Sequence, residues 1–187
     1  MTNVMSLPQS RRSAASRLVA AGLLIGTVDG LWAIVLTLIY GRSLTRLWQG
    51  IAATAFGERM FEGGASTVLL GVLMHFGVAF AWTALFLLLV SRSAWLRRVL
   101  DSPFGVLAVA AVYGPMIWIV MSVMVIPLLT HRPVTITGRW WIQLAGHVVF
   151  VGLPIVWSIW RSSRSAIVEQ VGPASRDVPS ARRAPRG

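Results

Sequence analysis

The chain contains no cysteine and no lysine, and only six of its 187 residues are acidic. The absence of cysteine excludes disulfides, thiolate metal sites and thiol catalysis. The absence of lysine excludes a Schiff-base lysine and a phosphate-binding lysine of the Walker type. Six acidic residues leave few candidates for catalysis by paired carboxylates. The sequence also has no G-x-S-x-G or H-E-x-x-H motif and no phosphate-binding glycine loop. We therefore predict a non-enzymatic protein without a metal or other cofactor.

Charge is scarce and apolar residues are abundant. Hydrophobic residues make up 56% of the chain and charged residues 12%, whereas a soluble domain carries about 25% charged residues. This balance is typical of a membrane protein. The net charge is +11, but the arginines lie at the ends of apolar segments and in the tails. We therefore expect the lipid bilayer and its anionic headgroups as partners, and no nucleic acid.

Four apolar runs are long enough to cross a bilayer, which takes about 20 helical residues. They predict an all-α, four-helix transmembrane bundle within a membrane domain of residues 17–160, with spans at residues 18–40, 66–90, 104–128 and 141–160. Residues 1–16 are a polar N-terminal tail. Residues 161–187 are rich in Ser, Arg, Pro and Ala, so we predict a disordered basic tail there.

The longest connection contains a further helical pattern. Residues 43–56 have apolar positions at helical spacing, with Ser43 as the expected N-cap and Gly57 at the end. About 14 residues are too few to cross a bilayer. We predict a short periplasmic helix that lies at the interface and is anchored by Trp48. A re-entrant or lid-like segment is the alternative.

Arginine counts predict the orientation of the chain. The N-terminal tail, the loop after the second span and the C-terminal tail hold twelve arginines, and the other two connections hold five. Arginine is enriched on the cytoplasmic side of membrane proteins. We therefore predict a multi-pass protein with both termini in the cytoplasm.

Small residues are placed for close helix packing. Gly22, Gly26 and Gly30 fall four residues apart on one face of the first span, and Gly71 lies in the second span. A stripe of small residues lets another helix come close. We expect these glycines to pack helices inside the monomer. A homo-oligomer or a membrane protein partner that docks on the stripe is the alternative.

Three ionisable side chains fall at similar depth. At about 1.5 Å per residue, Asp29, His75 and His147 lie about 16, 13 and 9 Å from the outer ends of their spans. Gln143 stands one turn above His147. Ionisable groups at such depth need a partner and mark a functional site by default. We predict that these four residues form a polar intramembrane layer, which Tyr113, Ser122 and the methionines of the third span complete.

Several roles fit this layer. In the leading hypothesis it is a structural clamp, in which Asp29 accepts hydrogen bonds from the histidines, or a proton-responsive site. One alternative is a membrane redox protein that binds a metal or a b-type haem, with Gly71 and Gly146 making room for the haem. Another is a helper subunit of a membrane complex.

Five stretches cover nearly all of residues 20–158. They read AGLLIGTVDGLWA, LWQGIAATAFG, FEGGASTVLLGVLMHFGVAF, YGPMIWIVMSVMVIPL and GHVVFVGLPIVW. Together they resemble a group of uncharacterised four-span bacterial inner-membrane proteins. The last stretch is also distantly similar to YagU-type proteins, which have been linked with acid resistance. The resemblance implies a four-span fold in the bacterial inner membrane. It also implies that Asp29, His75 and His147 are the site residues.

Overall fold

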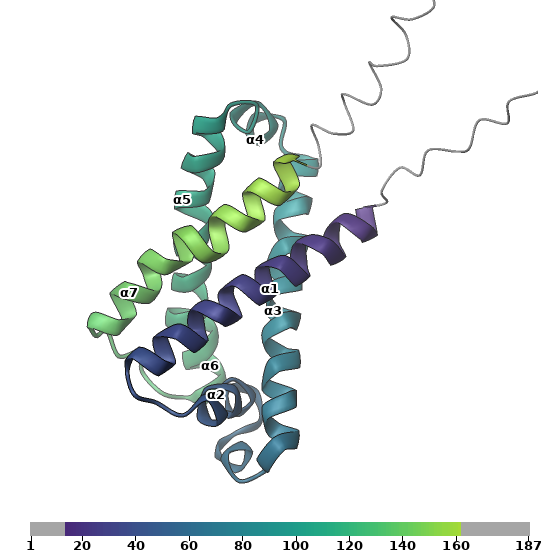
Figure 1. The fold of residues 1–187 in the computed structure, drawn as a ribbon. Coiled ribbons are helices and arrows are strands. Elements are labelled where there is room, and N and C mark those ends of the chain that lie inside the picture. The colour runs from purple at the N-terminus through teal and green to yellow at the C-terminus, as the bar shows by residue number, and fades with distance from the viewer. Residues whose placement is uncertain (1–13, 162–187) are drawn as a thin grey trace, which may run out of the picture.

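The computed structural model describes residues 14–161, which are mostly helical and contain no strand (Figure 1). In chain order the elements are α1 (Ala14–Ile39), α2 (Leu44–Phe56), η1 (Glu58–Phe61), α3 (Gly64–Arg92), α4 (Ala94–Val99), α5 (Pro103–Ile119), η2 (Val120–Val125), α6 (Ile126–Thr130), α7 (Gly138–His147) and η3 (Val148–Gly152). The helix that begins with α7 continues beyond η3 to Arg161. Of the predicted C-terminal tail, Arg161 is the last helical residue of the fourth span, and residues 162–187 lie outside the described range.

Four helical segments are long and apolar enough to cross a membrane. They are Ala15–Ile39, Gly64–Arg92, Pro103–Thr130 and Gly138–Arg161, each within three residues of the predicted bounds. The third consists of α5, η2 and α6, and the fourth of α7, η3 and the helix that follows. The predicted all-α four-helix bundle is therefore confirmed.

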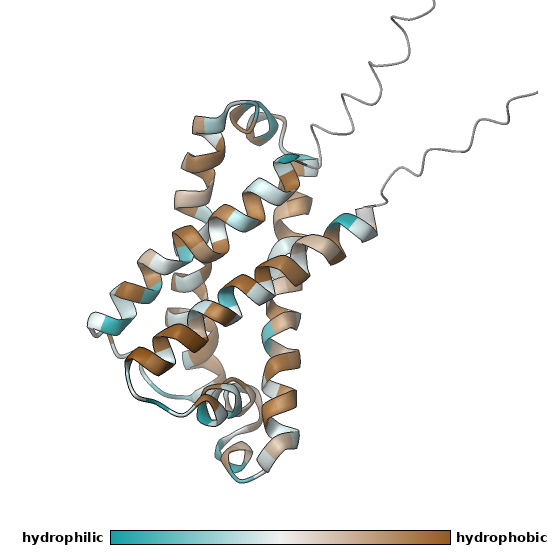
Figure 2. Cartoon of the chain, viewed as in Figure 1, coloured by the Kyte–Doolittle hydropathy of each residue, from teal (hydrophilic) through white to brown (hydrophobic). Residues whose placement is uncertain are grey.

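Apolar residues predominate along the long helices (Figure 2), and many of their side chains are exposed on the outside of the bundle. Leu38, Leu73, Val112 and Leu128, one from each of α1, α3, α5 and α6, are each more than half exposed. Exposed apolar faces of this extent are unfavourable in water but contact acyl chains favourably in a bilayer. Together with the length of the four helices, this surface identifies a multi-pass integral membrane protein.

The helices pack in an order that brings distant parts of the chain together. α1 lies against α3 and η3, and α5 lies against α7 and η3. α2 packs across α3 at the end of the bundle away from both described chain ends (Figure 1). The largest fully buried apolar side chains come from all four spans: Ile25, Phe86, Val106, Ile155 and Val156.

Two spans contain a wide π-helical turn, and each lies just before a proline. η2 precedes Pro127 and η3 precedes Pro154. The amide of Ile126 donates to the carbonyl oxygen of Met121, and that of Leu153 to Val148, so both bonds span five residues. Proline lacks an N–H and clashes with the carbonyl four residues earlier. Widening the preceding turn accommodates the proline without breaking the span.

The backbones of α5 and the fourth span are in direct contact. A Cβ atom added at Gly114 would overlap the carbonyl oxygen of His147, and one added at Gly152 would overlap that of Ala110. Only glycine permits this approach. The contact holds the turn at His147 against the middle of α5.

The glycine stripe of α1 is covered by the chain's own α3. A Cβ at Gly22 would meet the ring of Phe80, and one at Gly26 would meet the ring of Phe76. At Gly30 the nearest atom is Nε2 of His75, at 3.4 Å from the Cβ position. Within the described residues, the stripe therefore packs α1 against aromatic side chains of α3.

The segment between the first two spans is the helix α2. Its N-cap is Ser43, whose Oγ accepts a hydrogen bond from the amide of Arg46 at 3.4 Å, and Gly57 follows its last residue at φ 83°. A Cβ at Gly71 would overlap the carbonyl oxygen of Trp48, so α2 lies directly on the backbone of α3. The ring of Trp48 consequently packs on His75 inside the bundle. This differs from the lipid-facing anchor expected for Trp48.

Candidate functional site

The centre of the site is a contact between α1 and α3. Nδ1 of His75 lies 4.0 Å from Oδ2 of Asp29, and the two side chains are 11% and 25% exposed. Nε2 of His75 lies 2.8 Å from the carbonyl oxygen of Gly26, one turn before Asp29 on α1. Both ring nitrogens of His75 therefore face polar groups of the same helix.

These partners assign the protons of the His75 ring. A backbone carbonyl oxygen only accepts hydrogen bonds, so Nε2 must carry a proton and donate to Gly26. In a neutral imidazole the other nitrogen, Nδ1, is then bare. The proton that His75 can gain or lose is consequently the one on Nδ1, which faces the carboxylate of Asp29. The pair can thus hold one exchangeable proton between α1 and α3.

His147 occupies the fourth span beside this pair and is 8% exposed. Its Nδ1 lies 2.7 Å from the carbonyl oxygen of Gln143 and donates to it. This leaves Nε2 as the nitrogen that can change its protonation. An electrostatic interaction links the ring to Asp29. Asp29 therefore interacts with histidines from two of the elements packed against α1: with His75 of α3 at 4.0 Å, and electrostatically with His147 of the fourth span.

The side chain of Gln143 connects the fourth span to α1. Its Oε1 accepts a hydrogen bond of 2.9 Å from the indole Nε1 of Trp32. The same indole stacks on Phe150, with ring centroids 4.5 Å apart. A Cβ added at Gly146 would touch the indole, so glycine there makes room for it. Trp32 is thus clamped between a polar and an aromatic contact.

Aromatic rings surround both histidines. Trp48 and Phe76 contact His75 edge-on, each with a centroid distance of 5.6 Å. The ring of Trp118 lies 4.9 Å from that of His147, and its indole Nε1 is buried without a hydrogen-bond partner. Aromatic walls limit the access of water and so strengthen the interactions between the charges they enclose.

The other predicted participants have separate partners. The hydroxyl of Tyr113 donates to the carbonyl oxygen of Trp82 at 2.8 Å, and Oγ of Ser122 accepts from the indole of Trp140 at 3.1 Å. Neither of these bonds involves the Asp–His groups. Both tie the third span to its neighbours, so their role is in packing.

The metal and haem alternatives find little support in this geometry. Among residues 14–161, no three His, Asp or Glu side chains gather closely enough to hold a metal ion. Nε2 of His75, the nitrogen that an axial haem ligand would use, is directed at the carbonyl of Gly26. A bis-histidine haem would require both this bond and the surrounding aromatic contacts to be lost.

Sequence reasoning missed Trp32, which joins Gln143 to α1. Its signal was present, because Trp32 lies three residues after Asp29 and so shares a helix face with it. Trp118 and Trp48 gave no comparable signal, since their positions beside the histidines depend on how the helices are rotated.

Comparison with known proteins adds no further constraint. No protein-family model, curated protein or solved structure matches this chain. The resemblance to four-span bacterial inner-membrane proteins therefore stays a prediction, and functional inference has to rest on the geometry.

Proposed function

We propose that this integral membrane protein senses protonation through the Asp29–His75 pair, with His147 as a second, weaker participant. The observation that carries the proposal is the anchoring of Nε2 of His75 on Gly26 while Nδ1 faces Asp29 at 4.0 Å. Histidine changes its charge between about pH 5 and 8. A proton gained at Nδ1 turns a contact between a carboxylate and a lone pair into an ion pair. Such a change alters the force that holds α1 against α3.

The glycine packing links this contact to the way in which α1 packs against α3. Gly26 and Gly22 seat the rings of Phe76 and Phe80 against α1, in the turns that precede Asp29. A change in attraction between Asp29 and His75 therefore acts on a tightly packed interface, which responds by shifting between discrete arrangements. We propose that this shift is the response of the protein to acid.

The test is nuclear magnetic resonance of the protein labelled with 15N-histidine in detergent micelles across the acid-to-neutral range. The chain has three histidines, so three ring spin systems are expected and each is assigned by a single His→Gln variant. His75 should keep its Nε2 proton throughout and change only at Nδ1. Asp29→Asn should alter the titration of His75 most, alter that of His147 less, and leave that of His131 unchanged.

His131 is the internal control for this experiment, because it lies in the exposed turn after α6, outside the layer. A bare Nε2 on His75 would contradict the proposal, as would a His75 titration that Asp29→Asn leaves unchanged. The layer would then be a packing feature without a response to protons.

We further propose that the protein lies in the bacterial inner membrane with both termini in the cytoplasm and α2 on the periplasmic side. The support is the distribution of arginine along the sequence: twelve in the two tails and the loop after the second span, and five in the other two connections. Because the chain has no native cysteine, a single introduced cysteine reports its own location. A membrane-impermeant maleimide should label Thr135→Cys in spheroplasts, and Ala94→Cys only after permeabilisation. If Ala94→Cys alone were labelled in spheroplasts, the orientation would be the opposite of the one proposed.

A further inference from the structure

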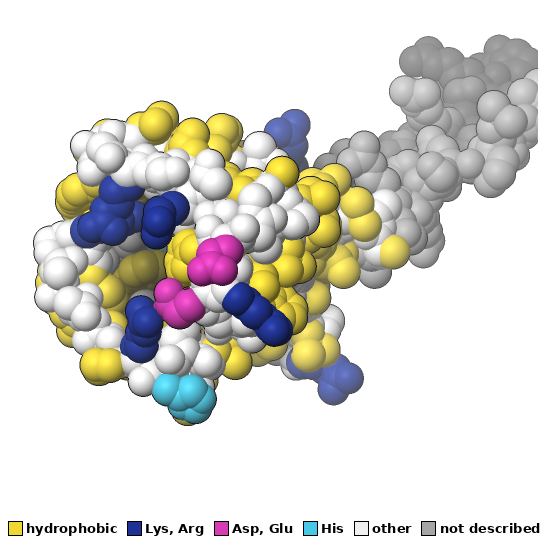
Figure 3. Space-filling model, turned by 90° about the horizontal axis from the view of Figure 1, so that it is seen from below, with side chains coloured by type: hydrophobic (Ala, Val, Ile, Leu, Met, Phe, Trp, Pro, Cys, Tyr) yellow, Lys and Arg dark blue, Asp and Glu magenta, His cyan; other side chains and the backbone are white. Residues whose placement is uncertain are grey.

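A second polar site lies at the end of the bundle where α1, α2 and α7 meet. A pocket of about 450 Å³ there is lined by Thr37, Arg42, Ser43, Arg46, Leu47 and Arg139. Figure 3 views this end and shows arginine side chains around a hollowed region, with acidic side chains at one side of it. Three of the six lining residues are arginines and none is acidic. Such a lining selects for an anion.

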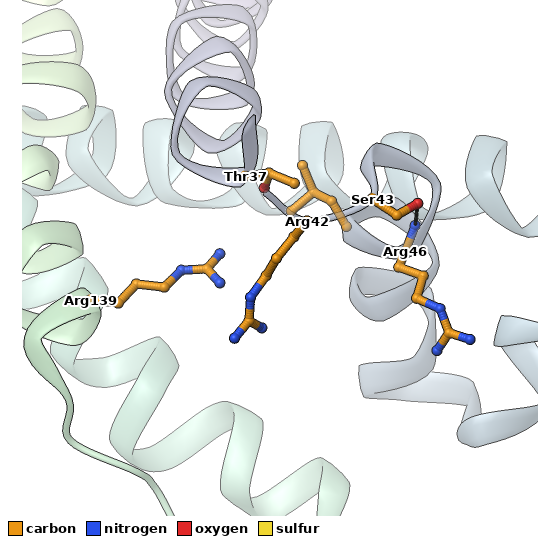
Figure 4. Close-up of a pocket in the computed structure, with 6 residues that line it drawn as sticks. Thr37, Arg42, Ser43, Arg46 and Arg139 are labelled. Atoms are coloured by element: carbon orange, nitrogen blue, oxygen red, sulfur yellow. Dashed lines mark hydrogen bonds between the residues drawn. The ribbon is translucent and has the colours of Figure 1, made fainter. Parts of the chain in front are cut away.

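Two of the arginines point their charges at the same space. Figure 4 shows the guanidinium groups of Arg42 and Arg139 approaching each other from opposite sides of the pocket. Arg46 directs its guanidinium away, over the ring of Phe61 at 5.6 Å. The facing pair repels unless an anion lies between the two groups. Within residues 14–161, the ion pairs found are Asp29–His75 and Glu58–Arg132, so neither guanidinium is neutralised by a carboxylate.

A buried hydroxyl in the pocket also has no partner. Thr37 is 2% exposed, and its Oγ1 forms no hydrogen bond. Figure 4 places this side chain at the edge of the pocket above the two guanidinium groups. An unsatisfied buried hydroxyl is unfavourable by about 1–3 kcal/mol, so a ligand oxygen that accepts a hydrogen bond from Thr37 would remove this cost.

Neighbouring elements add to the positive potential of this pocket. Arg42 and Ser43 directly precede the first residue of α2, and Arg139 lies in the first turn of α7. The positive N-terminal ends of α2 and α7 therefore lie at the pocket, where they oppose the partial negative charge at the C-terminal end of α1. Thr137, the N-cap of α7, makes no side-chain capping bond. The ring of Tyr40 supports Arg139, whose Cζ lies 5.4 Å from the ring centroid.

We propose that this pocket binds a phosphate group, held between the guanidiniums of Arg42 and Arg139 and hydrogen-bonded by the hydroxyl of Thr37. Arginine matches phosphate through two parallel N–H···O bonds, and two facing arginines can grip one phosphate from both sides. The pocket lies where α1, a helix long and apolar enough to cross a membrane, ends. The headgroups of a surrounding bilayer are expected at the ends of such a helix. The phosphate can therefore belong to an anionic phospholipid headgroup or to a free anion, and both present the same oxygens to the site.

The test measures binding to the purified protein in a zwitterionic detergent by the rise in its melting temperature. One series adds inorganic phosphate and a second adds dioleoyl-phosphatidylglycerol, with dioleoyl-phosphatidylcholine as the lipid blank. Specific binding raises the melting temperature in proportion to the logarithm of ligand concentration above the dissociation constant. The double variant Arg42→Gln/Arg139→Gln should lose at least about tenfold in affinity for the ligand that binds the wild type.

A matched control removes two arginines from the opposite end of the bundle. Arg92→Gln/Arg98→Gln alters two exposed residues near α4 and lowers the net charge equally. It should retain wild-type binding and so reports the non-specific effect of salt and lipid. Thr37→Val should weaken binding and Thr37→Ser should preserve it, which keeps the test valid if the double variant is unstable.

The outcomes separate the two sources of phosphate. A response to phosphatidylglycerol alone assigns a lipid headgroup, and a response to inorganic phosphate as well assigns a site open to free anions. Equal losses in the two double variants would overturn the proposal. So would a wild type that responds to neither ligand.

Discussion

Gly114→Ala is expected to destabilise the protein strongly, although alanine favours helices more than glycine does. The added methyl group overlaps the carbonyl oxygen of His147. Because that oxygen belongs to the backbone, the collision cannot be relieved by rotating a side chain. Overpacking costs about 1–3 kcal/mol, and a rigid obstacle places this substitution at the upper end. We expect the melting temperature in detergent to fall by about 6–10 °C.

Gly77→Ala is the matched control. Gly77 lies in the middle of α3, and no atom lies within 4 Å of the position that its Cβ would take. The substitution gains helix propensity of up to about 1 kcal/mol and meets no obstacle. Its melting temperature should equal or exceed that of the wild type. A Gly114→Ala protein as stable as Gly77→Ala would show that α5 and the fourth span are not in backbone contact.

Trp32→Ala is expected to have the second large effect, by separating the fourth span from α1. The substitution removes the stacked contact with Phe150 and leaves Oε1 of Gln143 without its donor. Loss of a buried tryptophan costs about 3–5 kcal/mol, and the partial exposure of Trp32 places it near the lower value. We expect a fall in melting temperature of about 6–10 °C, measured by circular dichroism in detergent.

Two comparisons identify the cause. Trp95→Ala removes a tryptophan that is 69% exposed and should change stability by less than about 1 kcal/mol. Trp32→Phe keeps most of the stacking but loses the hydrogen bond, which is worth about 1 kcal/mol. In a Gln143→Leu background that hydrogen bond is already absent, so Trp32→Phe should then cost less. If the stability costs of Trp32→Phe and Gln143→Leu were strictly additive, the hydrogen bond between the two side chains would contribute nothing to stability.

The parts of the fold that sequence analysis predicted depend on local chemistry or on depth. Hydropathy and length place the four spans, because only a long apolar helix is stable in lipid. Ser43 and Gly57 bound α2, because capping involves neighbouring residues alone. The rise per residue places Asp29 and His75 at a common depth, and the structure joins them at 4.0 Å.

The remaining contacts depend on helix rotation and on loops, which sequence spacing does not determine. The bond from Trp32 to Gln143 joins residues 111 positions apart. It forms only because α1 and the fourth span turn the right faces toward each other. Arg42 and Arg139 enter the sequence argument only as charges that set orientation. Their convergence in one pocket requires the ends of α1 and α7 to meet.

The wide turn η3 changes the direction in which side chains of the fourth span point around the helix axis. In a regular helix, residues eight apart such as His147 and Ile155 point about 80° away from each other. The one extra residue held in the turn removes about 100° of that rotation and reduces the difference to about 20°. His147 and Ile155 are indeed 8% and 0% exposed, and Ile159 is 4% exposed. The one inserted residue thus lets His147 in the first half of the fourth span and the isoleucines in its second half be buried on the same side of the helix.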